Sequence, residues 1–113
     1  MNIQIFGTKK SSDARKAERW FKERRIKFQY IDLNQKEISK GELRSVAQAV
    51  GGLAALIDEK AKDSYAVALL RHTPEGMLLD KLLENQQVLR QPIVRNGRQA
   101  TVGYAPDVWK TWE

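Results

Sequence analysis

Apolar and polar residues alternate in two early segments of the chain, and each alternation predicts a β-strand. The first segment covers residues 2–6, with Ile3 and Ile5 on one face, and the second covers residues 26–33. The segment between them, from residue 11 to about residue 25, has apolar residues at helical spacing. Strand, helix and strand in this order predict a parallel β-α-β unit with a right-handed crossover.

The predicted first helix has a start signal and a narrow buried stripe. Ser11 or Ser12 can cap it, because a hydroxyl accepts a hydrogen bond from a backbone N–H that the first turn leaves unpaired. Asp13 suits the positive end of the helix dipole. The stripe that we expect to be buried consists of Ala14, Ala17, Trp20 and Phe21.

The middle of the chain predicts short helices rather than strands. An amphipathic stretch begins near Ser39 and is stopped by the Gly51-Gly52 pair. Further helical patterns cover residues 53–57, 64–70 and 74–83. A block of helices therefore separates the β-α-β unit from the end of the chain.

The last part of the chain predicts a hairpin and a helix. Residues 91–95 form a strand pattern, Asn96-Gly97 is a strong two-residue turn signal, and residues 98–103 return as the antiparallel partner. A C-terminal helix begins at Ala105. The order is β-α-β, helical insertion, β-hairpin and C-terminal helix, which is expected of an α/β, thioredoxin-like fold with a mixed four-stranded sheet.

Length and hydropathy limit the organisation of the chain. Its 113 residues fit one domain, with a core from residues 1–33 and 89–113 and a helical insertion at about residues 34–88. No stretch approaches the roughly 20 apolar residues of a membrane helix, and the first residues lack the pattern of a signal peptide. We therefore expect a single cytoplasmic domain that has no contact with a membrane.

The chain contains no cysteine. This excludes disulfides, zinc–thiolate sites, thiol nucleophiles and dithiol redox chemistry within the polypeptide. A single histidine, His72, leaves little for a metal site, so we expect neither a metal nor a cofactor. The net charge of +6 favours acidic partners, such as nucleic acid, an acidic protein face or a small anion.

Two segments carry a resemblance to the arsenate reductase (ArsC)/Spx family. The family opens with a strand, a short loop that holds a cysteine, and a helix with a basic-Lys-Ala run and an aromatic pair, which residues 5–21 resemble. Its second signature is Leu-x-Arg-Pro-Ile-Val, a tight turn and Val-Gly-Phe-Arg-Pro-Glu, to which residues 89–94, Asn96-Gly97 and residues 102–107 are similar. The resemblance spans nearly the whole chain, and it implies a cis peptide bond before Pro92, beside the family's active site.

The departures from the family pattern fall on the positions that carry its chemistry. Ser11 stands at the position of the nucleophilic cysteine, and Ala14 stands at the second cysteine of Spx-type members. The family's arginines correspond to Lys60 in the insertion, Gln91 before the Pro-Ile pair and Ala105 before the later proline. We therefore interpret these positions as a degenerate site without a catalytic residue.

The resemblance implies a reaction in which a thiolate attacks arsenic and then forms a mixed disulfide with a small thiol. A serine hydroxyl cannot form that disulfide and is barely ionised near neutral pH. Arginines would bind the oxyanion through forked, charge-assisted bonds, whereas Gln91 is uncharged, Ala105 has no donor and Lys60 offers only a point charge. We expect a non-reductase. The alternative is an arsenate reductase-like oxidoreductase whose cysteine was lost or engineered to Ser11.

Other roles for the loop before the first helix compete with simple structural ones. A catalytic pair of Ser11 or Ser12 with His72 lacks an acidic partner, so a helix cap and a surface histidine are favoured. Backbone N–H groups at the helix start, with the charges of Lys9 and Lys10, suit an anion, but the alternative of a solvated basic loop is favoured. The candidate binding residues are Lys9, Lys10, Ser11, Ser12, Arg15, Lys16 and Pro92.

The first helix carries a basic face, which raises the question of nucleic-acid binding. Glu18 and Glu23 interrupt that face. At helical spacing they also pair with Lys22 and Lys27, respectively. With no recognition motif present, a solvated face is favoured and nucleic acid is disfavoured as a partner.

Three functions remain after this comparison of motifs. The first is a non-catalytic binding or regulatory module, because Spx-type relatives bind the RNA polymerase α-subunit and Gly51-Gly52 lies where that family presents a contact glycine. The second is the reductase alternative, and the third is a domain that binds a small anion or glutathione without turnover. At the C-terminus, Trp109 is expected to pack on the sheet and Trp112 to be an exposed anchor for a partner.

Overall fold

The computed structural model describes residues 1–113 and contains one four-stranded sheet in the order β2-β1-β3-β4. Its strands are β1 (Ile3–Gly7), β2 (Phe28–Asp32), β3 (Ile93–Asn96) and β4 (Gln99–Val102). β1 pairs in parallel with β2 and antiparallel with β3, and β3 pairs antiparallel with β4. The predicted mixed four-stranded sheet is thereby confirmed.

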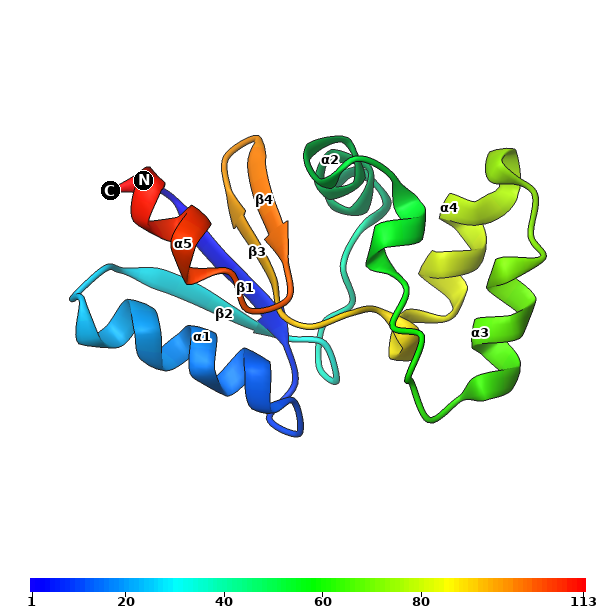
Figure 1. Cartoon of the computed structure of the whole chain (residues 1–113), viewed down its shortest axis with the longest axis horizontal. Helices are drawn as coiled ribbons and strands as arrows, with labels where there is room; N and C mark the ends of the chain where they lie inside the picture. Colours follow the sequence, from blue (N-terminus) through cyan, green and yellow to red (C-terminus); the bar gives the residue numbers. More distant parts are fainter.

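Helices fill the connections from β1 to β2 and from β2 to β3, and a tight turn joins β3 to β4 (Figure 1). Helix α1 (Ser12–Glu23) joins β1 to β2, and α5 (Pro106–Trp109) follows β4. The insertion between β2 and β3 holds α2 (Lys40–Val50), α3 (Ser64–Arg71) and α4 (Glu75–Glu84), on the side of the molecule away from α1. Short 3-10 turns lie at η1 (Leu53–Leu56), η2 (Gln86–Val88) and η3 (Lys110–Trp112). None of the helices is long and apolar enough to cross a membrane.

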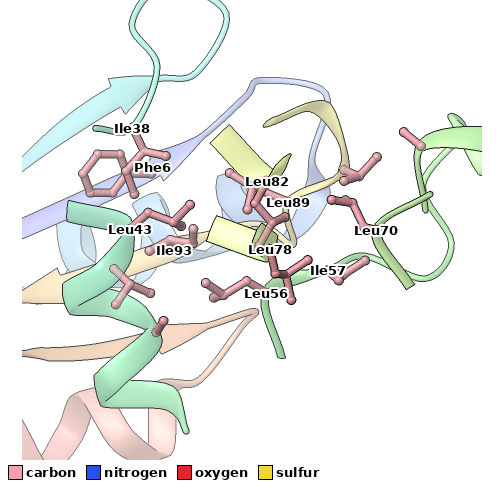
Figure 2. Packing of buried hydrophobic residues seen from close by; sticks show 14 of the residues in the cluster. Phe6, Ile38, Leu43, Leu56, Ile57, Leu70, Leu78, Leu82, Leu89 and Ile93 are labelled. Carbon is pink, nitrogen blue, oxygen red and sulfur yellow. The ribbon is translucent and has the colours of Figure 1, made fainter. Parts of the chain in front are cut away.

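The two faces of the sheet contribute to separate hydrophobic clusters. One cluster joins Ile3 and Ile5 of β1 to buried residues of α1 and to Trp109 of α5. The other joins Phe6 of β1 and Ile93 of β3 to the helical insertion, as Figure 2 shows. Side chains of β1 therefore point alternately to the two faces of the sheet, and both faces are covered.

Helix α1 buries the stripe that its sequence predicts. All four residues are buried, namely Ala14, Ala17, Trp20 and Phe21. The ring of Trp20 meets those of Phe21 and Trp109 edge-on, with centroids 4.9 and 5.4 Å away. The indole Nε1 of Trp109 donates to the Thr101 hydroxyl oxygen at 2.8 Å, so the one polar atom of this buried ring has a partner.

The first helix ends at Glu23, about two residues before its predicted end. Arg25 adopts a left-handed φ of 57°, and the N–H of Ile26 bonds back to the carbonyl of Phe21, so α1 ends at Glu23. Lys27 therefore lies beyond the helix, and the expected Glu23–Lys27 pair does not form. The other expected pair is present, with the Glu18 carboxylate and the Lys22 ammonium 3.9 Å apart.

The expectation for Trp112 is also wrong, whereas that for Trp109 is confirmed. Trp109 is fully buried. Trp112 follows it in η3, is half-buried, and packs against the same aromatic cluster instead of standing free. The continuation of α5 as a 3-10 turn returns its ring to the sheet side of the chain.

Polar contacts fix the insertion to the sheet. At the start of α2, Ser39 and Glu42 form a reciprocal capping box. The second carboxylate oxygen of Glu42 lies 3.7 Å from the Arg95 guanidinium of β3. The Gln86 side-chain amide both donates to and accepts from the backbone of Ile38, at 3.0 Å each. These contacts join the first and last residues of the insertion to each other and to the sheet.

Candidate functional site

The loop that follows β1 places Ser11 at the start of α1. The Ser11 hydroxyl oxygen accepts the backbone N–H of Ala14 at 3.1 Å, and the Ser11 N–H donates to the carbonyl of Thr8 at 3.1 Å. Of the two predicted caps, Ser11 is the one used, while Ser12 is exposed and is the first helical residue. The hydroxyl at the family's nucleophile position thus has a structural hydrogen bond of its own.

Gln91 holds the same loop from the opposite side. Its side-chain carbonyl oxygen accepts the backbone N–H of Thr8 at 2.7 Å and the Thr8 hydroxyl at 3.1 Å. The peptide bond to Pro92 is cis, as expected, and Pro92 is buried. An uncharged amide therefore occupies the position of the family's arginine, and its acceptor atom is used for loop structure.

Little space remains behind this loop. A Cβ atom on Gly7 would lie 2.7 Å from the Cβ of Ala14 and 3.2 Å from the hydroxyl oxygen of Tyr30. Ala14 is fully buried, so the position of a second family cysteine faces the end of β1 rather than solvent. Burial raises the pKa of Tyr30, and the negative charges of Glu18 and Asp32 raise it further. The Tyr30 phenol is therefore a neutral packing group and not a base.

The other two positions that the resemblance assigns to family arginines, Ala105 and Lys60, form local hydrogen bonds. Ala105 accepts, through its carbonyl, the N–H groups of Val108 and Trp109 and so begins α5. Lys60 lies exposed on a turn of the insertion, where its N–H donates to the Asp58 carboxylate at 2.9 Å. Neither residue forms a hydrogen bond with Ser11 or Gln91, and of the two only Lys60 carries a charge.

The basic candidates at the loop differ in how free they are. Lys9, Lys10 and Lys16 are exposed and form no salt bridge. The Arg15 guanidinium, by contrast, donates to the carbonyl of Lys9. Arg15 is thus part of the loop's framework, and the lysines are the residues available to a partner.

Arg90 is a cation near Pro92 that the sequence comparison did not single out. One of its terminal nitrogens lies 3.0 Å from the point that a Cβ atom on Gly103 would occupy, and the other lies 3.4 Å from the carbonyl of Ala55. The N–H of Gly103 in turn donates to the carbonyl of Pro92 at 2.9 Å. In the sequence, the only signal for Arg90 was its position next to Gln91.

A serine–histidine pair is absent from the structure. His72 caps the C-terminal end of α3 and is exposed, while the Ser11 hydroxyl is bonded at the start of α1. No group of three or more histidine, aspartate or glutamate side chains is arranged to hold a metal ion.

A separate cavity of about 260 Å³ lies where α2 ends. Gly51 and Gly52 adopt φ values of 91° and 136°, and a Cβ atom on either would meet nothing within 4 Å. The glycines therefore serve the backbone path and leave the cavity open. Its other lining residues are Arg44, Ala47, Gln48, Leu53, Glu75 and Leu79, which combine apolar side chains with one cation and one carboxylate.

Comparisons with known proteins agree with this arrangement. A family model described as the ArsC family matches residues 6–112. A protein of Oceanobacillus iheyensis named Global transcriptional regulator Spx 2 is 28% identical over 109 residues, covering 95% of this chain and 80% of that protein.

Solved structures show the same fold. The crystal structure of an ArsC family related protein from Bacteroides fragilis superposes with a TM-score of 0.85 at 19% identity, covering 100% of this chain and 98% of that one. Arsenate reductase from Vibrio cholerae gives 0.80 at 23% identity, covering 96% and 94%. At these identities the likeness concerns the fold, and the thioredoxin-like α/β prediction is confirmed.

Proposed function

The chain belongs to the ArsC family, and on that premise we propose that it is a non-catalytic binding or regulatory module that acts in the cytoplasm. The observation that carries this proposal is the hydrogen-bonded loop at the family's nucleophile position. Ser11 caps α1 and Gln91 anchors Thr8, so both side chains have local structural bonds in place of chemistry. The absence of any cysteine removes the thiol that reduction requires.

The loss of the oxyanion clamp supports the same proposal. Thiol-based attack on a tetrahedral oxyanion needs cations that bind the anion and favour the thiolate. Gln91 presents its carbonyl oxygen to the loop, Ala105 has no polar side chain, and Lys60 is exposed on a distant part of the sequence. A reductase whose cysteine alone was replaced would keep this clamp, and here it is missing.

We propose the RNA polymerase α-subunit as the partner, by analogy with Spx-type regulators. The relative named as a global transcriptional regulator supports this choice. So does the open cavity at Gly51 and Gly52, where the family resemblance places a contact glycine. The charges of Arg44 and Glu75, together with the apolar lining residues, suit a partner surface that also combines apolar and charged groups.

Direct titration with the purified α-subunit tests the proposal. Isotope-labelled chain is titrated with the α-subunit, and the amide signals that shift are mapped, with Kd measured by calorimetry. We expect saturable binding with shifts around residues 44–53, weakened about tenfold by Arg44→Glu, because an exposed attraction becomes a repulsion. Lys62→Glu, a surface charge reversal outside the cavity, is the matched control.

The result that contradicts the α-subunit proposal is equally definite. It is the absence of saturable binding, or binding that Arg44→Glu and Lys62→Glu weaken to the same degree. An assay of thiol-dependent arsenate reduction on the same preparation tests the non-catalytic part separately. Turnover by the cysteine-free chain would contradict that part.

A further inference from the structure

The net positive charge of this protein comes from one segment. Residues 9–27 contain nine lysines and arginines and three acidic residues, a net charge of +6, which equals that of the whole chain. The remaining residues carry eleven basic and eleven acidic side chains and are neutral overall. The segment consists of the loop after β1, helix α1 and the approach to β2. Its field is therefore directed at one side of the molecule.

This segment ends in a hollow of about 490 Å³. The hollow is lined by Lys22, Arg25, Ile26, Lys27 and Phe28. Its three cations surround two apolar side chains that are only half-buried. A surface that combines unneutralised charge with accessible apolar area suits a ligand that has both features.

The cations of the hollow differ from their neighbour Arg24. The Arg24 guanidinium stacks on the Trp20 ring at 3.9 Å and donates to the Trp20 carbonyl, so it is engaged within the protein. Arg25 and Lys27 form no salt bridge, and Lys22 has only a 3.9 Å contact with Glu18. The left-handed φ of Arg25 turns the chain between α1 and β2, next to Ile26 and Lys27.

An open sheet edge begins at the same place. β2 starts at Phe28 and pairs only with β1, so one side of this strand has no strand neighbour. At the other margin of the sheet, α2 packs against β4, whereas Figure 1 shows β2 lying along the outer margin beside α1. Unpaired N–H and C=O groups of an edge strand can bond to an added extended chain.

We infer that the hollow of Lys22, Arg25, Ile26, Lys27 and Phe28, together with the free edge of β2, is a docking site for an extended acidic peptide that carries an apolar side chain. The peptide's carboxylates face the three cations, its apolar side chain rests on Ile26 and Phe28, and its backbone continues the sheet at β2. This site is distinct from the Gly51–Gly52 cavity and gives the protein a second partner surface.

The features of the hollow favour a peptide over a nucleic acid. Nucleic-acid binding uses protein cations that are spaced to contact successive phosphates. On α1, Glu18 and Glu23 interrupt the cations. An edge strand offers a row of backbone donors and acceptors that an extended polypeptide matches in spacing. Phe28, which is the aromatic residue of the hollow, also packs toward Phe21 within the protein, and their ring centroids are 6.3 Å apart.

The test uses the full chain and a synthetic peptide in which glutamates flank one phenylalanine. Fluorescence anisotropy gives Kd, and amide shifts of the labelled protein locate the site. We expect saturable binding with shifts in residues 22–32. Arg25→Asp/Lys27→Glu weakens it about tenfold or more, because two attractions become repulsions. Asp at position 25 keeps the left-handed backbone accessible. Arg25→Gly is a second variant that removes the charge without strain.

Matched controls decide between peptide docking and general charge attraction. Like Arg25→Asp/Lys27→Glu, Lys62→Glu makes the net charge less positive, but at an exposed position of the insertion. We expect it to leave the Kd of the peptide unchanged. A peptide with serine in place of phenylalanine and one with glutamines in place of glutamates should both bind at least about tenfold more weakly. Tryptophan fluorescence of each variant verifies that the fold is intact.

Three results would overturn the inference. They are no saturable binding, equal weakening by Lys62→Glu and by the hollow variants, or tighter binding of an oligonucleotide of matched charge. Because Arg44→Glu alters only the cavity at α2, it should not affect the peptide. A failure of peptide docking therefore leaves the α-subunit titration unaffected, and the reverse also holds.

Discussion

The side-chain carbonyl oxygen of Gln91 lies 2.7 Å from the backbone nitrogen of Thr8 and accepts its hydrogen. The same oxygen accepts the Thr8 hydroxyl, so one amide fixes the loop between β1 and α1 to the residue before the cis proline. Since an arginine has only donors, it cannot take this role. Gln91 therefore binds the loop, whereas the arginine that the family resemblance implies at this position would bind an anion.

Substitution of Gln91 tests that assignment. Gln91→Arg leaves the Thr8 N–H and hydroxyl without their acceptor, so we expect a loss of about 1–3 kcal/mol in the free energy of unfolding. Gln91→Glu keeps an acceptor oxygen and should lose less. Urea unfolding measures both, and hydrogen exchange of the Thr8 amide reports the bond directly. Equal stabilities for the arginine and glutamate variants would argue against the role.

The buried pair of Trp109 and Thr101 gives a second prediction. Thr101→Val removes the hydroxyl that accepts from the indole Nε1 but keeps the volume, so a buried donor is left unpaired. We expect a loss of about 1–3 kcal/mol by chemical denaturation. Thr101→Ser keeps the hydroxyl and loses a methyl group, which should cost about 1 kcal/mol. Greater stability in the valine variant than in the serine variant would contradict the account.

Asp63 makes the stability of α3 depend on pH. Its carboxylate caps the helix, and hydrogen bonds from the Ala66 N–H and then from the Gln87 side chain lower the pKa of Asp63 below its ordinary value of 3.8. A group with a lowered folded pKa stabilises the protein above the unfolded value, and this contribution is lost as pH falls through the folded pKa.

The matched variant is Asp63→Asn, which can still cap the helix but cannot ionise. We expect the native protein to have the higher Tm at neutral pH and this advantage to disappear as the pH falls through the lowered pKa of Asp63 and the carboxylate becomes protonated. Thermal unfolding at a series of pH values measures the difference. A Tm difference that stays constant down to the lowest pH would show that ionisation of Asp63 has no part in it.

The parts of the fold that sequence could predict are those set by local pattern. The period-two strands, the cap at Ser11, the stripe of Ala14 to Phe21 and the Asn96-Gly97 hairpin each depend on a few neighbouring residues. The end of α1 was missed because Arg25 takes a left-handed φ that normally calls for glycine, and no residue type announces it.

The candidate site was predictable in residue identity but not in side-chain direction. The family resemblance sets Gln91 at an arginine position, yet only the fold shows that the side-chain oxygen of Gln91 bonds to Thr8. In the same way, the Arg15 guanidinium donates to the Lys9 carbonyl, and Arg90 lies against Gly103. Long polar side chains have many rotamers, so their partners depend on tertiary neighbours that a local pattern does not contain.

Restoration of the thiol tests the central claim most directly. Ser11→Cys is purified and its thiol is titrated with an aromatic disulfide reagent to establish that the sulfur is accessible. Glutathione- and glutaredoxin-dependent arsenate reduction is then measured beside the unchanged chain. We expect no turnover above the blank from either protein, because Gln91 and Ala105 supply no cation to hold the oxyanion. Arsenate reduction by Ser11→Cys would contradict the account, because it would show that a working reductase site lacked only its cysteine.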